Sequence, residues 1–207
     1  MSKAIIVVDF AYRPPKRKRA LRQVLKYLQY RDRRNNHLAQ HHQYERWKDH
    51  GLGGNHADIL QTCDALKSQH VLAWTWVVSP APDLMMLVPE HQQRDLISDL
   101  TEHVVEDYYM QRGFNTPEYA YVIHERETNT EQMNHLHTHV ILPGTAPDVG
   151  ERLSVYNNSS QGHDVLFRDI ASRHFAQMLD DTIGMDWRRL RDDPQPSILD
   201  EWFPRRA

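Results

Sequence analysis

Cysteine and long apolar runs are scarce in this chain of 207 residues. Its single cysteine, Cys63, has no partner for an internal disulfide, which fits a reducing cytoplasm, and its helical surroundings predict a small core residue. The apolar patch in MSKAIIVVDF spans about six residues, too few for a membrane span, and charge follows it instead of a cleavage site of small residues. These absences predict a cytoplasmic protein with no membrane segment and no secretory signal.

An excess of one charge sign is also lacking, because 25 Lys and Arg stand against 28 Asp and Glu, for a net charge of −3. Taken alone, that balance argues against a general nucleic-acid binder, but the distribution of charge matters more. Nine basic residues and one acidic residue lie between Lys16 and Arg34. Such a local basic stripe can contact the phosphates of a nucleic acid, although a solvated helix face would be the better explanation without the histidines downstream. Its members are Lys16, Arg17, Lys18, Arg19, Arg22, Lys26, Arg31, Arg33 and Arg34.

Apolar periodicity predicts one domain built from strands and helices. Strands are expected at residues 4–10, 70–79, 118–126 and 135–143, and helices at 16–30, 56–68, 90–112 and 163–180. Residues 31–54 are polar and are interpreted as a long loop. This order predicts an α/β (α+β) sandwich over residues 1–184, with a central antiparallel sheet and helices on its faces. A tail, residues 185–207, is expected to dock on it through Trp187, Trp202 and Phe203.

Histidine, in contrast, is abundant, with 14 residues, and three of them alternate along the strand predicted at 135–143. The side-chain period of a strand is two residues, so His135, His137 and His139 should share one face. His124 lies on the preceding predicted strand and can come level with His137 and His139. Neutral imidazole is a good ligand for divalent transition metals. We therefore predict a metal site made by His124, His137 and His139, with His135 in support.

These residues resemble the motif of the HUH relaxases, the nickases of plasmid and conjugative-element mobilization. That family carries two histidines flanking a hydrophobic residue on a central strand and a third histidine upstream, and HLHTHVIL and His124-Glu125 match this layout. The stretch VLKYLQYRDR is similar to the family's N-terminal helix with a catalytic tyrosine. The sequence departs from the pattern at Thr138, which replaces the hydrophobic residue, and at Arg126, which stands where an acid is usual. The gap between His124 and His137 is also longer than in the family.

The resemblance implies a fold like that of the HUH relaxases and a metal-dependent, site- and strand-specific endonuclease for single-stranded DNA at an origin of transfer. Tyr27 or Tyr30 would attack the DNA to give a 5′-phosphotyrosine adduct that allows religation. Mn²⁺ or Mg²⁺, with Zn²⁺ as a further candidate, would bind the three histidines, and Glu125 or Glu127 would replace the missing acid. Relaxosome accessory proteins are the implied protein partners. Bases would stack on Tyr30, Tyr44 or Trp47.

Three alternatives compete with this interpretation. HLHTHVI also fits the signature of the histidine-triad nucleotide hydrolases and transferases apart from Thr138, with His137 as a metal-independent nucleophile, although NTEQMN lacks the glycine that precedes that signature. A rolling-circle replication initiator would place its tyrosine helix after the histidines, whereas here a tyrosine-bearing helix is predicted before them. A non-catalytic DNA-binding accessory protein could keep the metal for stability alone.

Overall fold

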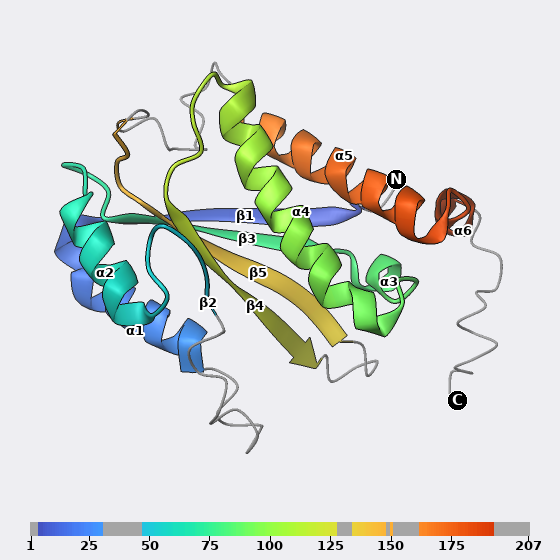
Figure 1. Ribbon diagram of the computed structural model, residues 1–207, viewed down its shortest axis with the longest axis horizontal. Coiled ribbons are helices and arrows are strands. Elements are labelled where there is room, and N and C mark those ends of the chain that lie inside the picture. The colour runs from blue at the N-terminus through green and yellow to red at the C-terminus, as the bar shows by residue number, and fades with distance from the viewer. Residues whose placement is uncertain (1–3, 31–46, 128–133, 148–149, 151–161, 193–207) are drawn as a thin grey trace.

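The computed structural model describes residues 4–30, 47–127, 134–147, 150 and 162–192, with backbone only at 125–127, 134–135 and 190–192. Five strands form one sheet in the order β1-β3-β5-β4-β2, and every neighbouring pair is antiparallel. The strands are β1 (Ile6–Arg13), β2 (Trp47–His50), β3 (Ala73–Pro80), β4 (Tyr119–Glu127) and β5 (Asn134–Pro143). The two strands that carry the histidines are thus adjacent and lie inside the sheet, not at its edge (Figure 1).

Helices cover both faces of this sheet (Figure 1). After the 3₁₀ turn η1 (Pro15–Arg17) they are α1 (Lys18–Tyr30), α2 (His56–Ala65), α3 (Pro82–Met85), α4 (Glu90–Gln111), α5 (His163–Ile183) and α6 (Trp187–Asp192). Among these described helices, none combines the length and apolar character needed to cross a bilayer. The antiparallel sheet with helices on its faces confirms the predicted α+β sandwich.

Strand alternation divides the buried side chains into two cores. The first core lies between the sheet and helices α4 and α5, and it includes Trp76, Tyr108 and Phe167 in edge-to-face contact. The second core lies between the sheet and helices α1 and α2, and it is smaller. It contains Cys63, which is buried, and burial raises the pKa of its thiol to about 12. This confirms Cys63 as a small core residue.

Strand β2 was not predicted, because its sequence WKDH carries a single apolar residue. It lies at the sheet edge, where only Trp47 is buried, so the pattern that marks a strand is nearly absent. The predicted loop 31–54 is therefore wrong at Trp47–His50, and its residues 31–46 lie outside the described part. At the other end, Trp187 of α6 joins the first core and donates its indole N–H to Asp180, whereas Trp202 and Phe203 lie outside the described part.

Thr138 occupies the position where the resembled motif has a hydrophobic residue, and α4 accounts for the difference. Its side chain is fully buried on the first-core side of β5 and lies 2.9 Å from the Thr101 hydroxyl. Thr101 donates its own proton to the carbonyl of Ile97, so the shared hydrogen bond must use the proton of Thr138. A threonine is accommodated here because α4 supplies the acceptor.

This direction of donation predicts unequal effects of two isosteric substitutions. Thr101→Val should destabilise the protein by about 1–3 kcal/mol, because it leaves the buried Thr138 hydroxyl without an acceptor. Thr138→Val should cost less, since Thr101 keeps its bond to Ile97, and the double variant should recover most of the loss. Urea unfolding of the four proteins measures these free energies. Equal destabilisation by both single variants would contradict the assigned direction.

Candidate metal centre

The pairing of β4 with β5 brings three histidines onto one face of the sheet. His124 and His137 are register partners, and His139 pairs with Val122, two residues earlier on β4. By alternation these histidines share the face of Val122 and Ile141, which belong to the second core. The centre therefore continues the second core along the sheet, towards the side where α1 ends.

The three imidazoles are close enough to hold one ion. Their ring centroids lie 5.7 Å apart for His124 and His137, 4.8 Å for His124 and His139, and 5.0 Å for His137 and His139. One nitrogen from each ring lies within 4.8 Å of the other two. Metal–nitrogen bonds of about 2.0–2.1 Å would bring such nitrogens to roughly 3 Å from each other, which small side-chain rotations achieve. The donor set fits a divalent transition-metal ion bound on one side by three neutral imidazoles.

Burial supports ligation over a surface role for these histidines. His124 is 1% exposed and His137 is 8% exposed, while His139 is partly buried. Three imidazoles packed this closely and away from water are unusual for a surface role, whereas a shared metal ion would give each of them a partner. Within the described part of the chain, this is the group of histidine, cysteine and acidic side chains that could hold an ion.

The end of helix α1 touches this centre directly. His124 Nε2 lies 2.8 Å from the backbone carbonyl oxygen of Leu28, a residue 96 positions away. A carbonyl only accepts hydrogen bonds, so Nε2 is the protonated nitrogen of His124. The partial negative charge at the C-terminal end of a helix also favours a nearby cation. Sequence patterns gave no signal for this contact, because a backbone carbonyl is the acceptor.

Both candidate tyrosines lie on the last turn of α1, beside Leu28. Tyr27 is 55% exposed, whereas Tyr30 is partly buried with its ring 5.6 Å from that of His56, in an edge contact. Gln29 on the same turn is buried, and its Oε1 accepts the backbone N–H of His56 at 2.7 Å and contacts His56 Nδ1 at 2.8 Å. Burial, followed by the charges of nearby Lys26 and Arg22, lowers the pKa of His56. The tyrosine-bearing turn is therefore held by both β4 and α2.

The predicted DNA-contacting cations differ in their surroundings. Lys18 forms an ion pair with Asp64 at 2.7 Å, so its charge is already compensated. Arg19, Arg22 and Lys26 are exposed at helical spacing and lead along α1 towards its tyrosine-bearing end. Lys16 and Arg17 are exposed in η1, and the outer residues Arg31, Arg33 and Arg34 lie outside the described part.

Other predicted site residues are described only in part. The backbone of Glu125 pairs with Leu136 and that of His135 pairs with Arg126, while the side chains of Glu125 and His135 lie outside the described part. Trp47 is 4% exposed and packs in the second core, so its suggested role as a platform for a DNA base is wrong.

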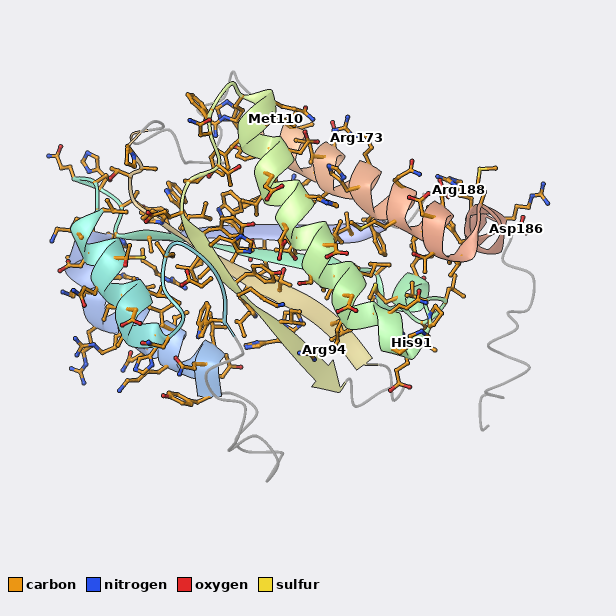
Figure 2. The ribbon with its side chains drawn as sticks, viewed as in Figure 1. His91, Arg94, Met110, Arg173, Asp186 and Arg188 are labelled. Atoms are coloured by element: carbon orange, nitrogen blue, oxygen red, sulfur yellow. The ribbon has the colours of Figure 1, made fainter. Side chains whose placement is uncertain are left out.

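The geometry predicts that each of three substitutions, His124→Ala, His137→Ala and His139→Ala, weakens Mn²⁺ binding at least about tenfold, because each removes one nitrogen ligand. Isothermal titration calorimetry measures the affinity. His91→Ala is the matched control, since His91 lies exposed near the start of α4 (Figure 2). Unchanged affinity in all three variants would remove the metal assignment.

Comparisons with protein-family models, with curated proteins and with solved structures found no match to this chain. Its functional assignment therefore rests on its own residues. Those residues form an antiparallel five-stranded sheet with helices on both faces, and on the sheet lies a three-histidine group able to hold a metal ion.

Proposed function

We propose that this protein is a relaxase-type nickase, a metal-dependent endonuclease that cuts single-stranded DNA through a tyrosine. One observation carries the proposal: the last turn of a tyrosine-bearing helix is docked on a three-histidine group by the bond between His124 Nε2 and the Leu28 carbonyl. A tyrosine nucleophile and a metal centre on neighbouring elements can together carry out phosphodiester transesterification. Nicking at an origin of transfer, in mobilization or conjugation, is the biological setting that this chemistry suits.

The proposed reaction exchanges one phosphodiester for another. The hydroxyl oxygen of Tyr27 or Tyr30 forms a bond to phosphorus, and the bond from phosphorus to the 3′ oxygen breaks. The tyrosine proton passes to a base, for which Glu125 or a water molecule is the candidate, and the leaving 3′ oxygen takes up a proton. A bound divalent ion supplies the Lewis acidity that offsets charge on the phosphate oxygens. Attack by a 3′ hydroxyl on the phosphotyrosine reverses the steps and reseals the strand.

Two features of the site favour this function over the histidine-triad alternative. Metal-independent attack by His137 gives no role to His124, which is buried beside His137 with its ring centroid 5.7 Å away. That alternative also gives no role to a tyrosine-bearing helix docked at the same place. The order of elements, with α1 before the histidine strands, favours a relaxase over a rolling-circle initiator.

The exposed cations of α1 support DNA as the substrate. Arg19, Arg22 and Lys26 follow one side of the helix, and Tyr27 and Tyr30 lie at its far end. A strand whose phosphates contact these cations would be led towards the three histidines. The protein's net charge of −3 does not oppose this, because the positive charge is concentrated where it is used.

Label transfer tests the reaction and its polarity. A random-sequence pool of single-stranded oligonucleotides with a 3′ fluorophore should label the protein covalently in Mn²⁺, because the adduct keeps the fragment on the 3′ side of the cut. The same pool labelled at its 5′ end should leave the protein dark. Tyr27→Phe or Tyr30→Phe should abolish the signal, and peptide mass spectrometry identifies the modified tyrosine.

Three outcomes decide between the functions. If the wild-type protein binds Mn²⁺ but acquires no label, the nickase proposal fails and a non-catalytic DNA-binding role takes its place. Metal-independent hydrolysis of a nucleoside phosphoramidate, lost in His137→Ala, would instead support the histidine-triad alternative. Label acquired through a tyrosine outside α1 would reject both candidate nucleophiles.

Salt dependence tests the path of the DNA. Neutralising Arg19, Arg22 and Lys26 together with glutamine should reduce the slope of log affinity against log salt by about 2, at about 0.7 per phosphate contact of a single strand. Lys18→Gln is the matched control, because Lys18 is compensated by Asp64 and its loss should leave the slope nearly unchanged. Fluorescence anisotropy with a labelled oligonucleotide measures both. An unchanged slope in the triple variant would place the DNA elsewhere.

A further inference from the structure

We propose that His124 couples ion binding to the docking of the tyrosine-bearing helix, with Nδ1 as its ligand atom and Nε2–H as the donor that holds the Leu28 carbonyl. The inference deepens the proposed function and rests on it only in taking the three histidines as a metal site. One imidazole ring would thus bind the ion through one nitrogen and hold helix α1 through the other.

The contact with Leu28 determines the tautomer of His124. Its Nε2 lies 2.8 Å from an oxygen that has no proton to give, so Nε2 must carry the hydrogen. In the neutral ring the lone pair then belongs to Nδ1. Since a metal binds the nitrogen that carries the lone pair, an ion can join His124 at Nδ1 while the bond to Leu28 stays intact.

The Leu28 carbonyl needs a hydrogen-bond donor from outside helix α1. Helix α1 ends at Tyr30, so the carbonyls of its last four residues lack the usual partner within the helix. Leu28 is only 3% exposed, so little water reaches its carbonyl and a protein donor is needed. His124 supplies that donor from β4, and the end of α1 depends on it.

Ion binding strengthens this bond. A cation on Nδ1 withdraws electron density from the ring and makes Nε2–H a better donor, as charge-assisted hydrogen bonds are stronger than neutral ones. Linkage makes the effect reciprocal: an ion that favours the docked helix is itself bound more tightly when the helix is docked. The proposed enzyme would therefore hold its nucleophile in place most firmly when its metal is present.

A second contact on the same turn provides an internal comparison. Gln29 is held by His56 of α2 through two contacts to its Oε1. His56 contributes no atom to the three-histidine group, so this latch does not change when an ion binds. Loosening it should free the end of α1 equally with and without metal, whereas loosening the His124 contact should remove the difference between the two states.

Hydrogen exchange tests the coupling without any DNA. In the wild-type protein, saturating Zn²⁺ should slow the exchange of backbone amides in the last turns of α1 about tenfold, within the range of typical coupling between sites. Without metal, His124→Ala should exchange faster than wild type in this turn, while His137→Ala should match wild type because it leaves the Leu28 contact in place. His56→Ala removes the ring contact to Gln29 Oε1 and keeps the backbone N–H contact, so it should speed exchange yet keep the response to Zn²⁺.

NMR spectroscopy identifies directly which nitrogen of His124 binds the metal. Long-range ¹H–¹⁵N correlation spectra of the Zn²⁺-loaded wild-type protein, with ¹⁵N-labelled histidine, should show metal at Nδ1 of His124 and a proton at Nε2. Metal at Nε2 would overturn the inference, and so would Zn²⁺ binding that slows exchange in β4 and β5 but leaves α1 unchanged. Neither result depends on a variant that must fold.

These outcomes are separable from those of the proposed function. A Zn²⁺-responsive α1 in a protein that acquires no DNA label would keep the coupling and reject the nickase. A labelled protein whose α1 ignores the metal would keep the nickase and reject the coupling.

Discussion

The register between β4 and β5 is the constraint on which the centre depends. His124 faces His137 across this pair, and a slip of one residue would turn the histidines of one strand to the opposite face. Both faces of β5 enforce the register, because Leu136 and Val140 enter the first core while Ile141 enters the second. The hydrogen bond from Thr138 to Thr101 further fixes the position of β5 against α4. The metal centre is thus positioned by packing on both sides of the sheet.

Helix α1 combines three tasks that need different sides of one element. Its buried leucines, Leu21, Leu25 and Leu28, form the stripe that seats it in the second core. Its cations Arg19, Arg22 and Lys26 occupy the exposed side. Its last turn presents two tyrosines and gives a carbonyl to His124. Because one rigid helix carries all three, seating the leucines also sets where the basic side and the tyrosines lie relative to the histidines.

The position of the centre at the end of the second core also has an electrostatic consequence. Apolar neighbours such as Val122 and Ile141 on the same sheet face limit access of water, which strengthens charge interactions nearby. The C-terminal end of α1 adds a partial negative charge at the same place. This end of the core therefore favours a bound cation, and it disfavours an anion that binds without one.

The sequence by itself determined the order of most strands and helices and the identity of the three histidines, because both depend on local periodicity: period two places His137 and His139 on one face, and apolar steps mark the helices. It did not determine β2, whose four residues lack a pattern and take strand form only by pairing with β4. The bond from His124 to Leu28 and the latch between Gln29 and His56 were decided by tertiary structure alone. The first joins residues 96 positions apart and uses a backbone acceptor, and every residue type carries that same carbonyl, so no sequence pattern can mark it.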